Sequence, residues 1–128
     1  MLSQYMKRII STEYLFAAVL VALFYVTVGG FAWYWLIILF LAFDVSIAGY
    51  LVNKKVGAIT YNIGHSLIGP AILLALYVAF DMKWMLFVTL LWLFHIFVDR
   101  AQGYGLKHFE GFEHTHLGKI GKAKKAEK

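Results

Sequence analysis

Four long apolar runs dominate this sequence, and their lengths constrain the fold more than any other feature. They cover approximately residues 13–28, 31–52, 57–80 and 84–101. A helix of roughly 20 apolar residues crosses a hydrocarbon core of about 30 Å. Because 62% of the 128 residues are hydrophobic and only 15% are charged, a soluble domain of this size could not bury so much apolar surface. The sequence therefore predicts an all-α fold, a bundle of four transmembrane helices.

The rest of the chain is short enough to belong to one domain. We expect a single integral membrane domain over residues 1–118, in which Gly103 and Gly105 end the last helix and residues 102–118 fold back as an interfacial segment. Residues 119–128 hold five lysines and one glutamate, which predicts a disordered tail attracted to anionic lipids of the bilayer. Since no folded domain presents these charges, they do not indicate binding to nucleic acid.

The distribution of basic residues predicts the orientation in the membrane. If the four spans alternate in direction, all twelve Lys and Arg residues except Lys83 fall on one side. An excess of positive charge of this kind marks the cytoplasmic side. Both termini are therefore expected in the cytoplasm, and the protein is expected in the cell (inner) membrane as a multi-pass protein.

Two local patterns predict where helices begin and bend. Residues 1–11 are expected to be an interfacial lead, with Ser11 or Thr12 as the cap of the first helix. Pro70 cannot donate a hydrogen bond to the carbonyl of Ser66, so a kink is expected in the third span just beyond its polar first half.

Four ionisable residues interrupt the apolar runs at a similar depth. Counting about 1.5 Å per residue from the expected cytoplasmic ends places Asp44 and His65 about 12 Å deep and His95 about 9 Å deep. Asp99 lies nearer the surface and shares a helix face with His95, four residues before it. Because ionisable groups in a membrane segment cost several kcal/mol, they indicate a functional site. We expect three helices to bring these four residues together.

This set of side chains suits a divalent metal such as zinc, manganese or iron, which take nitrogen and oxygen ligands. A bound metal would produce a hydroxide nucleophile near neutral pH. His116, in the carboxy-terminal segment, is a candidate for a further ligand. A haem held between His65 and His95 is less favoured, because a haem ligand does not need Asp99 one turn away.

Other polar residues are candidates for binding or orienting a substrate. Asn62 and Ser66 flank His65, and could orient its ring or contact a substrate. Arg100 and Lys107 lie near the expected mouth of the site, where they could hold a phosphate or carboxylate head group. Asn62 and Ser66 could instead only hydrogen-bond between helices. Arg100 and Lys107 could instead only contribute to the excess of positive charge on the cytoplasmic side.

The motifs carry two resemblances. The chain resembles a small bacterial family of multi-pass membrane proteins catalogued as a domain of unknown function, over nearly its whole length, and this resemblance implies no established activity. Its motifs are Tyr61-Asn62-x-x-His65-Ser66, His95-x-x-x-Asp99-Arg100-x-x-Gly103-Tyr104-Gly105-Leu106-Lys107 and Thr115-His116-Leu117-Gly118. The order of Asp44, His65 and His95-x-x-x-Asp99 is more distantly similar to the membrane-bound metal-dependent hydrolases of bacteria.

Three functions are consistent with these observations. The leading hypothesis is metal-dependent hydrolysis of a lipid or another small amphiphile that enters from the cytoplasmic leaflet. The same Asp and His residues could instead form the relay of a proton-coupled carrier or small transporter, which would need a homo-oligomer because four spans enclose only a small pathway. A non-catalytic membrane scaffold, in which Asp44 only hydrogen-bonds to the histidines, is the third.

Overall fold

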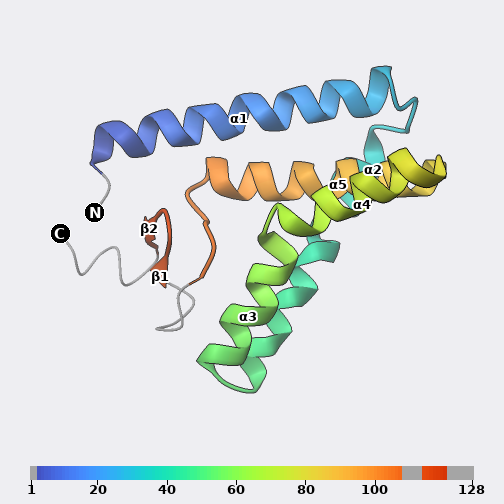
Figure 1. Ribbon diagram of the computed structural model, residues 1–128. Helices are drawn as coiled ribbons and strands as arrows, with labels where there is room; N and C mark the ends of the chain where they lie inside the picture. Colours follow the sequence, from blue (N-terminus) through green and yellow to red (C-terminus); the bar gives the residue numbers. More distant parts are fainter. Residues whose placement is uncertain (1–2, 108–113, 121–128) are drawn as a thin grey trace.

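The computed structural model of the chain describes residues 3–107 and 114–120 (Figure 1). The predicted all-α fold is confirmed, and the β structure of the described residues is confined to a hairpin of two very short strands and one isolated bridge. Four helical stretches are long and apolar enough to cross a membrane, namely Gln4–Thr27, Tyr34–Leu51, Lys54–Phe80 and Lys83–Ala101. The elements are α1 (Gln4–Thr27), α2 (Tyr34–Ile38), the 3₁₀ helix η1 (Phe40–Leu51), α3 (Lys54–His65), α4 (Ile68–Phe80), α5 (Lys83–Ala101), β1 (His114–Thr115) and β2 (Gly118–Lys119).

Helix α5 is the centre of the fold. Its buried side chains include Leu86, Leu90, Leu91, His95 and Ile96, and it packs against α1, α4 and η1. The outer helices instead expose many large apolar side chains, more than the surface of a water-soluble monomer carries. This division between a buried central helix and apolar outer faces is the one expected of a protein whose surface contacts lipid.

The helices are arranged in two parts that meet at an elbow. Figure 1 shows α1 and α4 running alongside α5, while η1 (teal) and α3 form a hairpin that leans away from them. The elbow is formed by two breaks, one at Leu39 between α2 and η1 and one at Ser66–Leu67 between α3 and α4. His65, the last residue of α3, therefore lies at the junction of the two parts.

The first helix begins earlier than predicted. The Oγ atom of Ser3 accepts a hydrogen bond from the Met6 N–H at 3.1 Å and caps α1, so the expected lead over residues 1–11 is largely helical. The hydroxyl of Thr12 donates to the carbonyl of Arg8 inside the helix at 2.8 Å and caps nothing. Because charged side chains at a helix end can reach water, Lys7 and Arg8 do not stop the helix.

The second span is not a continuous α-helix. After one turn and a half of α2, the chain continues as a 3₁₀ helix over twelve residues, Phe40–Leu51. Runs of this length are uncommon. With a rise of about 2.0 Å per residue against about 1.5 Å in an α-helix, the 3₁₀ form adds about 6 Å to this span. This 3₁₀ helix packs closely against α3, since a Cβ atom at Gly49 would collide with the side chain of Thr60.

The third span is broken, and the break precedes Pro70. Ser66 has an extended conformation, with φ −84° and ψ 148°, and α4 starts again at Ile68. Pro70 falls in the first turn of α4, where its missing N–H costs least. The expected kink is therefore a complete interruption, placed four residues before the proline.

Side chains from other helices satisfy the backbone groups that this interruption leaves behind. The indole Nε1 of Trp92 donates to the carbonyl of Gly64 at 2.6 Å, and the Nη2 of Arg100 donates to the carbonyl of His65 at 3.3 Å. The Oγ of Ser66 accepts from the Ile68 N–H at 3.2 Å. A break inside a membrane segment is stable only with such replacements, because lipid offers no hydrogen bonds.

The chain turns back after α5, as the glycine pattern predicts. Gly103 has φ +90°, a left-handed conformation that favours glycine, and follows the last turn of α5. The segment then returns to α3, where Lys107 meets Asn62, and a β-bridge joins Lys107 to Thr115. Lys119 belongs to β2, and most of the predicted tail, residues 121–128, lies outside the described residues.

Candidate metal centre

The four ionisable residues predicted to share a depth do converge at the elbow. Asp44 comes from η1, His65 from the end of α3, and His95 and Asp99 from one face of α5. One ligand-type atom from each residue lies within 4.8 Å of all the others. Side chains from three helices, separated by up to 55 residues in the sequence, thus face one point.

The distances within the cluster are short and nearly equal. His65 Nε2 lies 3.4 Å from Asp44 Oδ1, 3.2 Å from Asp99 Oδ2 and 3.1 Å from His95 Nε2. His95 Nε2 lies 3.2 Å from Asp44 Oδ1 and 3.1 Å from Asp99 Oδ2. A tetrahedral zinc ion with ligands at about 2.0–2.1 Å separates those ligands by about 3.3–3.4 Å. These five distances match the ligand spacing around a tetrahedral cation to within a few tenths of an ångström, and the carboxylate oxygens of Asp44 and Asp99 lie within 4.8 Å of each other.

Hydrogen bonds on the far side of its ring orient His65. Its Nδ1 lies 3.1 Å from the carbonyl oxygen of Tyr61 and 3.3 Å from the hydroxyl of Ser46. Because a carbonyl only accepts, we assign the proton to Nδ1, which leaves the lone pair on Nε2 in the neutral ring. Nε2 is directed at two carboxylate oxygens, and a cation at the common point would be bound by this nitrogen and those oxygens together.

Aromatic residues of η1 hold His95. The rings of Phe40 and Phe43 lie 4.4 and 5.7 Å from its ring, measured between centroids, and Phe43 also stacks on Trp92 at 5.6 Å. In a 3₁₀ helix, residues three apart lie above one another, so Phe40, Phe43 and Ser46 share the face that meets the two histidines. The 3₁₀ geometry thus aligns the residues that support the cluster.

A stack of side chains covers the other face of His65. The Tyr61 ring lies parallel to the His65 ring, with centroids 3.9 Å apart and planes 4° apart. The ammonium group of Lys107 lies over the opposite face of Tyr61, 4.7 Å from its centroid. Lys107 is only 4% exposed, and this burial lowers the pKa of its ammonium group to about 8. Lys107 is therefore close to the cluster but separated from His65 by one aromatic ring.

Arg100 is buried and ties helices together. One guanidinium nitrogen donates to the hydroxyl of Tyr14 on α1 at 2.9 Å, and another donates to the carbonyl of His65. The side chain is 7% exposed. These contacts link α1, α3 and α5 and give Arg100 a structural role beside the cluster, whereas its predicted contact with a head group remains a prediction.

Asn62 and Ser66 contact the backbone in the structure. Asn62 Oδ1 accepts from the Lys107 N–H at 2.6 Å, and its Nδ2 donates to the Lys107 carbonyl at 2.8 Å. Ser66 Oγ accepts from the N–H of Ile68, the first residue of α4. Asn62 therefore holds the segment that follows α5 against α3, and through it places Lys107 beside the cluster.

His116 lies outside the cluster. Its Nδ1 accepts a hydrogen bond from the Leu106 N–H at 2.7 Å, its own N–H donates to the Leu106 carbonyl, and its side chain is exposed. His116 therefore joins the turn between β1 and β2 to the backbone of Leu106. Sequence patterns did not identify Ser46, Tyr61 and Trp92 as supports of the site. For Ser46 the available signal was a hydroxyl in an apolar run, two residues from Asp44.

One side of the cluster is more open than the others. The side chain of Asp44 is 32% exposed, against 12% for Asp99, 3% for His65 and 0% for His95. A ligand or water molecule would therefore reach the centre past Asp44. The negative end of α3, which terminates at His65, adds a field that favours a cation at this point.

Comparison with known proteins places the chain in a family without assigning an activity. No curated protein and no solved structure gives a significant match. The distant resemblance to metal-dependent hydrolases is accordingly not shown. A family match does extend over residues 7–120, which includes every residue of the cluster. The chain therefore belongs to the family described as Domain of unknown function (DUF4260).

Proposed function

We propose that this protein is an integral membrane metalloenzyme that hydrolyses a lipid or another small amphiphile. The observation that carries the proposal is the convergence of Asp44, His65, His95 and Asp99, in which each histidine Nε2 lies 3.1–3.4 Å from both carboxylate oxygens and from the other histidine. A divalent ion held there would supply a hydroxide at neutral pH and polarise a carbonyl or phosphoryl oxygen.

The composition of the cluster favours catalysis over a purely structural metal. Structural zinc sites are closed and rich in cysteine, whereas this chain has no cysteine and offers two imidazoles and two carboxylates. The exposed side of Asp44 supplies access. The position at the elbow, inside a membrane-type fold, favours a substrate that is itself amphiphilic.

The surrounding residues have separate roles in this proposal. Tyr61 and Ser46 orient His65, while Phe40 and Phe43 exclude water from His95. Lys107 places a positive charge behind Tyr61 that counters the charge of the two carboxylates below pH of about 8. This gives Lys107 a part in the electrostatics of the site, in addition to the head-group contact expected of it.

The test is elemental analysis of the detergent-purified protein, followed by a screen for lipid hydrolysis. Zinc, manganese or iron should be present near one ion per chain, and both metal and hydrolysis should be lost in His95→Ala. His116→Ala is the matched control, because it removes a histidine outside the cluster and should retain metal and activity. Equal metal content in the wild type and His95→Ala would refute the metal centre.

One observation favours a second function, a small carrier. Transport proteins often use interrupted membrane helices whose ends point at the bound ion, and α3 ends at His65 beside the cluster. This function requires an oligomer, because four spans enclose little space. A strictly monomeric protein in detergent and in bilayers would argue against it, whereas ion uptake into vesicles that His95→Ala abolishes would support it.

A further inference from the structure

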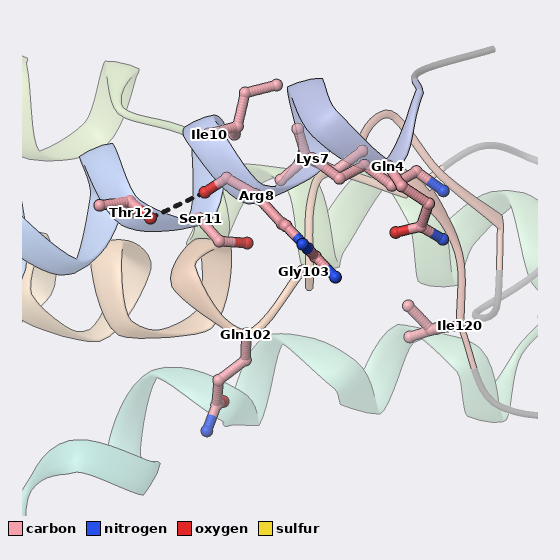
Figure 2. Close-up of a pocket in the computed structure, with 10 residues that line it drawn as sticks. Gln4, Lys7, Arg8, Ile10, Ser11, Thr12, Gln102, Gly103 and Ile120 are labelled. Atoms are coloured by element: carbon pink, nitrogen blue, oxygen red, sulfur yellow. Dashed lines mark hydrogen bonds between the residues drawn. The ribbon is translucent and has the colours of Figure 1, made fainter.

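A separate cavity lies where the start of α1 meets the chain that follows α5. It measures about 450 Å³ and contains none of the four cluster residues in its lining. Figure 2 shows Gln4, Arg8 and Ser11 extending from α1 toward the carboxy-terminal segment. The lining residues that matter here are Lys7, Arg8, Ser11, Gln102, Leu117 and Ile120.

The polar side of this cavity is chemically suited to an anion. Lys7 and Arg8 contribute two positive charges, and no acidic residue belongs to the lining that the structure describes. Ser11 and Gln102 add a hydroxyl and an amide that can donate hydrogen bonds to oxygen. A guanidinium group can hold two oxygens of one phosphate at once, and a nearby ammonium adds charge without fixed geometry.

An apolar cavity continues from the same place toward the middle of the membrane. It measures about 330 Å³, shares Ser11 and Gln102 with the first cavity, and is lined deeper along the two helices by Leu15, Val98 and Ala101. Leu15 lies about one turn beyond Ser11 on α1, and Val98 about one turn before Gln102 on α5. The two cavities together form a slot with a cationic polar end and an apolar end.

We propose that this slot binds one anionic phospholipid, with its phosphate between Lys7 and Arg8 and the start of an acyl chain between α1 and α5. The order of the two ends agrees with a lipid in a bilayer, because the polar end is at the start of α1 and the apolar end lies further into the spans. This site is independent of the metal centre and of the reaction proposed for it.

The experiment is native mass spectrometry of the full chain in detergent, with phosphatidylglycerol or phosphatidylcholine added. The wild type should retain one phosphatidylglycerol and prefer it to phosphatidylcholine. The double variant Lys7→Gln/Arg8→Gln should bind it about 30-fold less tightly, from about fivefold for each charge removed. Because Lys7 is half-buried and Arg8 is exposed, the variant should fold, and an unchanged helical circular dichroism spectrum and elution volume in detergent would confirm that it does.

A matched variant separates a specific site from general attraction to anionic lipid. Lys54→Gln/Lys55→Gln removes the same charge at the start of α3, on the side of the membrane where Lys7 and Arg8 are expected, but outside the slot. The retained lipid should survive this change. Equal losses in both double variants, or equal retention of the two lipids by the wild type, would overturn the proposal.

The apolar end distinguishes a lipid from a free phosphate. Ala101→Phe would fill the deeper cavity and should reduce binding of phosphatidylglycerol, while leaving any binding of inorganic phosphate unchanged. If Ala101→Phe retains the lipid as the wild type does, and inorganic phosphate displaces it completely, the lipid assignment is wrong and the cavity binds phosphate alone.

Discussion

Replacing Asn62 with alanine should release the segment that follows α5 while leaving the helices folded. The Asn62 side chain exchanges two hydrogen bonds with the backbone of Lys107, at 2.6 and 2.8 Å. At about 1 kcal/mol for each neutral hydrogen bond, their loss amounts to about 2 kcal/mol, or about a 30-fold larger open population of the segment.

Hydrogen exchange of the Lys107 amide measures this change directly, because that N–H donates to Asn62. The matched control is Asn53→Ala in the same helix. Asn53 caps α3 by accepting from the Val56 N–H at 2.8 Å, so its loss costs about 1 kcal/mol at the other end of α3. Exchange at Lys107 should rise in Asn62→Ala and not in Asn53→Ala. A loss of metal from Asn62→Ala with unchanged exchange would instead support its predicted role in orienting His65.

Two further predictions follow from buried cations. Arg100→Met should lower the free energy of unfolding by about 3 kcal/mol, because it removes charged hydrogen bonds and leaves the carbonyl of His65 unpaired. Tyr14→Phe removes only the hydroxyl partner and should lower it by about 1 kcal/mol. Equal effects of the two variants in thermal unfolding would contradict the role assigned to Arg100. For Lys107, burial lowers the pKa of the ammonium group to about 8 from its ordinary 10.5. Between pH 8 and 10.5 the unfolded chain therefore binds more protons at this residue than the folded protein does. The free energy of unfolding should accordingly rise with pH over this range. The rise is at most about 3 kcal/mol, and a denaturation series in which Lys107→Met shows the same rise as the wild type would disprove it.

The position of the candidate metal centre was predictable because, in a chain of membrane-spanning helices, depth is a local property of the sequence. Each span is set by a run of apolar residues, and a count of residues from its end gives the height of Asp44, His65 and His95. The spacing of His95 and Asp99 placed both on one helix face. These predictions need no knowledge of which helices are neighbours, and the structure brings the four residues together as expected.

The supporting contacts could not be predicted in this way, because they join segments distant in the sequence. The break at Ser66 is stabilised by Trp92 and Arg100, which come from α5, so Pro70 alone indicated the bend but not its position. The close approach of η1 to α3 at Gly49 is likewise a contact between segments that no local pattern places.

The sequence by itself therefore determined the all-helical fold, its four stretches long and apolar enough to cross a membrane, and the residues of the candidate metal centre. Transfer of apolar side chains into lipid is nearly additive along the chain, so it can be summed without a structure. Only the tertiary structure decided which polar groups meet. It separated His116 from the cluster and brought Lys107 close to it through Asn62, because hydrogen bonds depend on distances of a few tenths of an ångström between elements that no local pattern places.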